Sequence, residues 1–307
     1  AALFSSTITL TLCAQTSRER GREWFSCGTA AARSKIEARS LGYSFVIGPD
    51  GGVNLEMRFC PSGEYTAGAS ARYKQKRLAF HQFMEDEHKV RMEYGFWPSA
   101  TEISQKQWRT IMKDTGMPLT VDRLKAKIDE DGRKLFEKGS KTLKEVYETA
   151  NAVNMNLLCG VYDAESPVYY VSWEDAVAFC ERLTYIERQT GHSMPDEYVY
   201  RLPTEKEWEY ACRGTSDAEI PGVGELEVTD KWYDCPNLES LAWHMGNAHN
   251  GYAGIGKSFL PGAGNAFVRK RGLKSPNEFG IYDILGNVAE WCVCNIFVMC
   301  WSVFYTV

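Results

Sequence analysis

Apolar side chains recur at helical spacing in two stretches of the chain's second half. The first follows Ser172, a candidate N-cap with Asp175 three positions later. Its apolar positions are Trp173, Ala176, Val177, Cys180 and Leu183. The second follows Pro203, where Thr204 and Glu207 repeat the capping pattern. Its apolar positions are Trp208, Ala211 and Cys212. We expect two amphipathic helices whose tryptophans and cysteines pack in the core.

Two other patterns predict turns and an insertion. Asn277-Glu-Phe-Gly280 and Leu285-Gly-Asn287 separate short apolar runs, and Gly and Asn supply the positive φ angles that tight turns need. Residues from about 114 to 160 are charged, helix-favouring and only thinly apolar. We expect an inserted helical pair that decorates the domain surface, with a partner surface as the alternative.

Composition narrows the class of protein. The chain has 307 residues, of which 44% are hydrophobic, enough for one large core in a main domain with insertions. Its net charge of −5 gives no basic field for nucleic acid, so nucleic-acid binding is disfavoured. The basic stretch at residues 72–77 is interpreted as a solvated face.

The ten cysteines show no paired spacing typical of zinc sites. Cys292 and Cys294 are close-set, but one intervening residue suits neither a zinc knuckle nor a thioredoxin-type motif. We therefore expect mostly buried free thiols. A secreted disulfide framework is the alternative.

Several ordered segments resemble the formylglycine-generating enzyme, or sulfatase-modifying-factor, family. The strongest two are residues 200–211 and 277–292, and the others are residues 56–68, 90–97 with 101–108, 166–180 and 243–247. The resemblance implies an α+β, C-type-lectin-like fold with small twisted antiparallel sheets, two main helices and the inserted helical segment. On this basis residues 53–307 form the lectin-like domain, and residues 1–52 form an N-terminal segment.

That N-terminal segment has two interpretations. Residues 1–13 have the length and apolarity of a signal-peptide core ending at Cys13, as in bacterial lipoproteins, although a basic start and small residues before the cysteine are absent. Alternatively, residues 20–46 are similar to the family's C-terminal segments, which are missing after Cys292. A permuted order would then supply the closing strands. Residues 44–47 fit an opening hairpin before Val53 equally well.

The family resemblance leaves function open between oxidase and binding protein. Formylglycine-generating oxidases need two reactive cysteines that bind copper and activate oxygen toward a sulfatase cysteine. No cysteine pair here lies in a matching motif, although Cys294 with Cys300, or Cys27 with a distant partner, are candidates. Iron-dependent sulfoxide-synthase relatives need three histidines, and the four candidates are interpreted as surface histidines: His81, His88, His244 and His249. A catalytically dead structural paralogue is a third possibility.

Variable proteins of diversity-generating retroelements resemble the same family, and they bind ligands through a diversified segment of the lectin fold. Two mixed aromatic and small-residue segments here suggest such a face. Its predicted ligand-binding residues are Phe25, Ser26, Asn295, Phe297, Met299, Trp301, Ser302, Phe304 and Tyr305. A buried strand is the alternative for residues 293–307.

The prediction is therefore a non-enzymatic binding protein of the bacterial cell surface or periplasm, with a possible lipid anchor at Cys13. Its ligand is expected to be a protein or another macromolecule, because a lectin-like fold does not by itself imply sugar binding. No cofactor is required. The resemblance makes structural calcium possible near the Gly286-Asn287 turn.

Overall fold

Three helices, each begun by a side-chain cap, lie in the described part of the chain: α3 (Gln105–Met112), α7 (Trp173–Thr190) and α8 (Glu205–Arg213). The computed structural model describes residues 6–7, 11–14, 42–47, 53–70, 85–113, 164–168, 171–190, 198–214, 238–244, 247–248, 268–293 and 297–298. Helix α8 begins at a capping box in which the Glu207 amide donates to Thr204 Oγ1 at 3.2 Å and the Thr204 amide donates to Glu207 at 2.8 Å. In α7 the Asp175 amide donates to Ser172 Oγ at 3.1 Å. Both predicted helices are confirmed, caps included.

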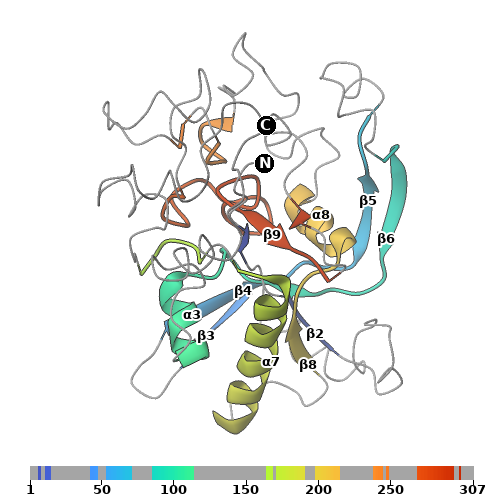
Figure 1. The fold of residues 1–307 in the computed structure, drawn as a ribbon. Coiled ribbons are helices and arrows are strands. Elements are labelled where there is room, and N and C mark those ends of the chain that lie inside the picture. Colours follow the sequence, from blue (N-terminus) through green and yellow to red (C-terminus); the bar gives the residue numbers. More distant parts are fainter. Residues whose placement is uncertain are drawn as a thin grey trace, which may run out of the picture.

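Short strands in the described residues form four small sheets (Figure 1). Two sheets have three strands, in the orders β1-β9-β10 and β7-β2-β8, and the others are the hairpins β3-β4 and β5-β6. The strand bounds are β1 Ser6–Thr7, β2 Thr11–Ala14, β3 Gly42–Ile47, β4 Val53–Arg58, β5 Gly63–Ala67, β6 His88–Met92, β7 Trp97–Pro98, β8 Tyr198–Arg201, β9 Ala289–Trp291 and β10 Phe297–Val298. All pairs are antiparallel except β1 with β9. The predicted α+β class with small, mainly antiparallel sheets is confirmed.

The N-terminal strands join elements that lie far away in sequence. Strand β1 pairs with β9, where Ser6 lies opposite Ala289. Strand β2 lies between β7 and β8, and its Cys13 lies opposite Val199. Strand β3 pairs with β4 along its whole length, with Tyr43 opposite Met57. Residues 44–47 therefore belong to the opening hairpin, the second of the two placements considered for them.

Two hydrophobic clusters hold these elements together. The first packs α3 and α7 against β4, β7 and β8, and the Trp108 and Phe179 rings stack at 5.4 Å. The second packs α8 against β5, β6 and the 281–292 segment. Trp208, Cys180 and Cys212 are buried in these clusters, as predicted, and Trp173 is half-buried against the first.

Three predictions fall partly or wholly outside the described residues: the helical insertion at 114–160, the basic stretch at 72–77 and the family-like segment at residues 20–46. Within the residues that are described, no helix combines the length and apolarity needed to cross a membrane.

Candidate functional site

The Asn277 side chain ties the 277–281 turn to the end of α8. Its Oδ1 accepts from the amides of Phe279 and Ile281 at 3.0 and 3.1 Å. Its Nδ2 donates to the carbonyl of Ala211 at 2.6 Å. Gly280 closes the turn with a φ of +77°, a conformation in which glycine has no Cβ penalty. These contacts explain the predicted turn, since an asparagine here satisfies both the turn and the helix end.

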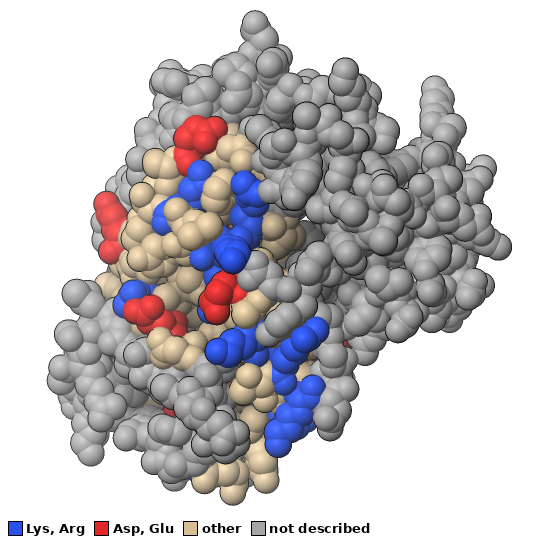
Figure 2. All heavy atoms as spheres, turned by 90° about the vertical axis from the view of Figure 1, so that its left-hand side faces the viewer, with Lys and Arg blue, Asp and Glu red and all other residues tan. Residues whose placement is uncertain are grey.

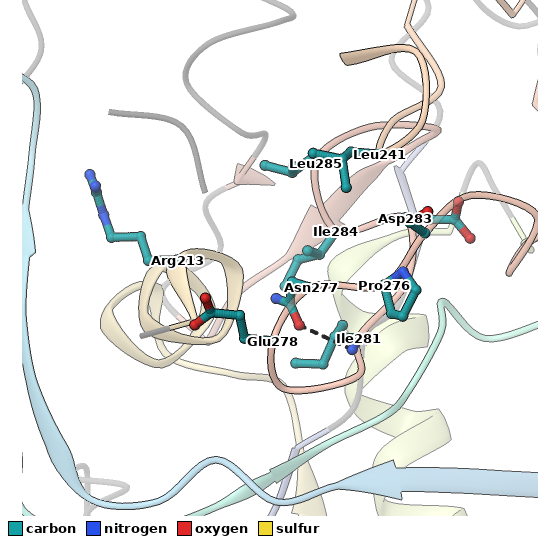
Figure 3. A pocket seen from close by; sticks show the side chains of 10 residues that line it. Arg213, Leu241, Pro276, Asn277, Glu278, Ile281, Asp283, Ile284 and Leu285 are labelled. Atoms are coloured by element: carbon teal, nitrogen blue, oxygen red, sulfur yellow. Dashed lines mark hydrogen bonds between the residues drawn. The ribbon is translucent and has the colours of Figure 1, made fainter. Parts of the chain in front are cut away.

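A small pocket of about 100 Å³ lies between this turn and the end of α8 (Figure 3). Apolar side chains dominate the labelled wall, with Leu241, Ile284 and Leu285 on one side and Ile281 on the other. Arg213 and Glu278 lie at the α8 side. Pockets for whole small-molecule ligands are several times larger, so this one has room for a single side-chain-sized group.

Two buried carboxylates interact near the pocket, and one of them, Asp283, lines it. Glu102 Oε2 accepts from Asn287 Nδ2 at 3.2 Å, and Asp283 Oδ2 accepts from the amide of Gly272. Burial, followed by the nearby charges of Asp283 and Glu290, raises the pKa of Glu102 well above its usual range. Burial also raises the pKa of Asp283 from 3.8 to about 6. Desolvation therefore works against full ionisation of this group of acids.

Arg271 is the cation of this cluster. Its NH1 donates to Thr101 Oγ1, the Glu102 carbonyl and Gln107 Oε1 at 2.5, 3.0 and 3.1 Å. Burial lowers its pKa, opposed mainly by Glu165. The guanidinium therefore links the 268–275 turn to the N-terminal end of α3.

The oxygens beside the Gly286-Asn287 turn are of the type that calcium prefers. Glu102 Oε1 and Asp283 Oδ1 are buried and accept no hydrogen bond within the described structure. In that same part of the chain, however, no three acidic, histidine or cysteine side chains are arranged to hold a metal ion. This geometry does not fit a calcium site made from such a group.

All four cysteines with described side chains are buried and lie outside any disulfide: Cys60, Cys180, Cys212 and Cys292. Burial, with a smaller contribution from Glu207, raises the pKa of Cys60 well above its usual range. Burial likewise raises the pKa of Cys180, with Arg201 only partly opposing it. Because the thiolate is the reactive form, burial disfavours a nucleophilic or copper-binding role for Cys60 and Cys180. The prediction of buried free thiols is confirmed for these four.

The predicted ligand-binding residues lie almost entirely outside the described part. Phe297 belongs to β10 and lies opposite Trp291 of β9. The other eight fall outside the described residues: Phe25, Ser26, Asn295, Met299, Trp301, Ser302, Phe304 and Tyr305. The same holds for Cys27, Cys294 and Cys300, the candidate oxidase cysteines. The binding face stays a prediction.

One of the histidine interpretations was wrong. His244 is only 1% exposed, and its backbone amide donates to Asn247 Oδ1 at 2.8 Å. A single sequence gives a loop histidine no periodic signal of burial, so this position could not be predicted. The His88 side chain, by contrast, is 40% exposed, as expected. His81 and His249 lie outside the described residues.

Residues 50–296 match the profile of the FGE-sulfatase family, described as a "Sulfatase-modifying factor enzyme 1-like domain". The formylglycine-generating enzyme of Thermomonospora curvata is 34% identical over 127 residues, or 41% of this chain and 32% of that protein. Inactive C-alpha-formylglycine-generating enzyme 2 of Bos taurus is 32% identical over 128 residues, with 41% and 32% coverage. Chaperone protein LppX of Paenibacillus barcinonensis is 28% identical over 165 residues, with 43% and 53% coverage.

The matched stretches thus span about half or less of these relatives' own lengths. Among solved structures, Treponema denticola variable protein 1 aligns with a TM-score of 0.48 at 19% identity. That alignment covers 82% of this chain and 76% of the Treponema protein.

Proposed function

The chain belongs to the sulfatase-modifying-factor family, with its C-type-lectin-like fold, and from this premise we propose that it is a non-enzymatic ligand-binding protein. The scaffold would display a variable face, comprising residues 25–26 and 295–305, to a macromolecular ligand. Rigid elements such as α8 and the 277–287 turn would hold that face in place, while aromatic side chains supply the contact area.

The burial of the described thiols carries the proposal. An oxygen-activating oxidase of this family needs two accessible thiolates close together. In this chain burial raises the pKa of both Cys60 and Cys180, and Cys212 and Cys292 pack in the second hydrophobic cluster. The side chains of these four cysteines therefore belong to the hydrophobic core.

Two relatives support a function without catalysis. One is named an inactive formylglycine-generating enzyme and the other a chaperone. A family scaffold used in such proteins does not require an oxidase site, because function depends on the site rather than on the fold.

The size of the pocket favours a large ligand. About 100 Å³ beside Leu241 and Leu285 accepts one side chain, not a whole metabolite. A protein ligand could insert a single apolar group here while most of its contact area lies elsewhere.

The second candidate is a copper-dependent formylglycine-generating oxidase acting on sulfatase cysteines. The observation that favours it is the 34% identity to the Thermomonospora curvata enzyme. In this chain the candidate reactive pairs are Cys294 with Cys300, or Cys27 with a distant partner.

The deciding experiment is a Cu(I) titration of the reduced protein, followed by oxygen consumption with a cysteine-containing sulfatase peptide. We expect neither tight copper binding nor conversion of the peptide, with the Thermomonospora curvata enzyme as positive control. Copper-dependent turnover that disappears in Cys294→Ala or Cys300→Ala would overturn the proposal and establish the oxidase.

A selection of displayed peptides tests binding directly. Peptides selected on the wild-type chain should lose affinity for a Phe297→Ala/Trp301→Ala/Tyr305→Ala variant and keep it for Tyr185→Ala. Tyr185 is a matched control because it is an exposed aromatic residue on α7, outside the predicted face. Equal affinity for both variants would show that the predicted face is not the binding surface.

A further inference from the structure

Seven cations lie in two short stretches that contain no exposed acid. Helix α3 and its C-cap carry Lys106, Arg109 and Lys113, all exposed. The 268–275 turn adds four more, Arg269, Lys270, Arg271 and Lys274. We call these seven residues the basic face. Its local charge is opposite to the chain's net charge of −5.

Arg271 joins the two stretches into one surface. Its hydrogen bonds to Thr101 and Gln107 fix the 268–275 turn against the first turn of α3. Figure 2 shows this side of the molecule, where Lys and Arg side chains gather in neighbouring groups. The acids beside them are Glu165, 3.4 Å from Arg271, Glu239, whose carbonyl accepts from Lys274, and the buried Glu102 and Asp283. They offset only part of the positive charge.

The basic face also carries an apolar tip. Leu273 is 64% exposed. Among the residues that the structure describes, it is one of three large hydrophobic side chains that are exposed. It follows Gly272, whose φ of +70° turns the chain outward and whose amide donates to the buried Asp283. The turn is therefore anchored from beneath while its leucine points away from the core.

Trp243 supports the cations around that tip. Lys274 Nζ lies 3.9 Å from the centroid of the Trp243 ring, and the Arg269 guanidinium lies 5.0 Å from it. Cation–π contacts of this kind hold the two charges beside one another despite their mutual repulsion. The result is a pre-ordered group of cations around an exposed leucine.

We propose that the basic face docks on a membrane surface rich in anionic lipid headgroups. Lys270 and its neighbours would contact the phosphates, and Leu273 would enter the boundary between headgroups and acyl chains. The leucine favours a membrane over nucleic acid, because phosphate contacts alone gain nothing from an exposed apolar side chain. The basic face shares no residue with the predicted ligand face, and this proposal does not depend on the proposed function.

The test is co-sedimentation of the full 307-residue chain with vesicles of phosphatidylcholine alone or mixed with phosphatidylglycerol. We expect binding only to the mixed vesicles, weakening as salt is added, since salt screens surface charge. Lys270→Glu should lower the partition coefficient by about tenfold or more. Leu273→Ser should lower it several-fold while leaving its salt dependence unchanged.

Lys206→Glu is the matched control, because it makes the same charge change at an exposed position on α8, away from α3. It should bind like the wild type, and thermal melting of all three variants confirms that they fold. Equal binding to both vesicle types, or wild-type binding by Lys270→Glu and Leu273→Ser, would overturn the proposal. Binding to soluble polyglutamate but not to anionic vesicles would also overturn it and indicate an acidic protein partner.

Discussion

At the scale of single residues, Asp283 is a buried acid whose ionisation costs stability. Its pKa rises from 3.8 to about 6 on folding, so the folded chain binds the proton more tightly than the unfolded chain. Protonated Asp283 therefore contributes favourably to the free energy of unfolding. This contribution is fully present below about pH 4 and is lost as pH rises through 6. At neutral pH the cost corresponds to about 3 kcal/mol.

Asp283→Asn should remove that cost. Asparagine tolerates the positive φ of 59° and can still accept from Gly272, so we expect a gain of up to about 3 kcal/mol at pH 7.5. The advantage over wild type should shrink toward zero near pH 4. Urea unfolding of both proteins at the two pH values, without divalent cations, measures it. A difference that does not depend on pH would contradict the assignment.

Trp208 and Glu290 form a buried pair in which the indole N–H donates to the carboxylate. A double-mutant cycle with Trp208→Phe and Glu290→Met should give a coupling free energy of about 1–3 kcal/mol, because methionine removes the acceptor and a hydrogen bond to a buried acid is lost only once. Urea unfolding of the four proteins provides the values. Simple additivity would show that the two side chains act independently.

Residue-level chemistry was only partly predictable from the sequence. Burial of Cys180 and Cys212 followed from helical periodicity, because neighbours three and four positions away share their face. The contacts of Glu102 with Asn287 and of Arg271 with Thr101 join positions far apart in the chain. No spacing rule reports such contacts, so this cluster appears only in three dimensions.

At the scale of elements, the N-cap of α8 contributes measurably to the stability of the chain. Thr204→Ala removes the acceptor for the Glu207 amide and should destabilise the chain by about 1 kcal/mol. Thr204→Ser keeps the hydroxyl and serves as the control, with a stability close to wild type. Differential scanning calorimetry should show a lower Tm only for the alanine variant. An unchanged Tm would mean that tertiary packing alone fixes the helix start.

Elements were predictable where two independent signals coincided. For α7 and α8, a capping pattern and a helical period point to the same start. Helix α3 also begins at a capping box, Ser104 with Gln107, within the family-like stretch 101–108. Strand β2 lies in residues interpreted as a signal-peptide core, since short apolar runs fit both structures.

At the scale of the whole molecule, the N-terminal strands connect separate parts of the fold. Strand β2 pairs with both β7 and β8, and β1 pairs with β9. Removing residues 1–14 should therefore leave β8 and β9 without these partners and abolish cooperative unfolding. Removing residues 1–5 alone, which precede β1, is the control and should preserve it. Thermal unfolding followed by near-ultraviolet circular dichroism distinguishes the two truncated chains. A cooperative melt of the chain that lacks residues 1–14 would contradict the connecting role of these strands.

More of the fold than of the candidate site could be predicted from the sequence. Motifs such as residues 200–211 and 277–292 identify the family because their turns and caps are local. The pocket beside Leu241 and the basic face around Leu273 depend on how distant loops meet. Such surfaces follow from tertiary packing, which periodicity does not encode.

The pairing of β1 with β9 also affects how the chain can be made. A ribosome releases Ser6 and Thr7 long before it has translated Ala289 and Glu290, the residues that they must meet. At ordinary rates of synthesis, that interval is on the order of ten seconds or more. During it, the first strands lack their β9 partner and depend on other segments or on chaperones. The pairing of β1 with β9 can therefore form only after Glu290 has been translated.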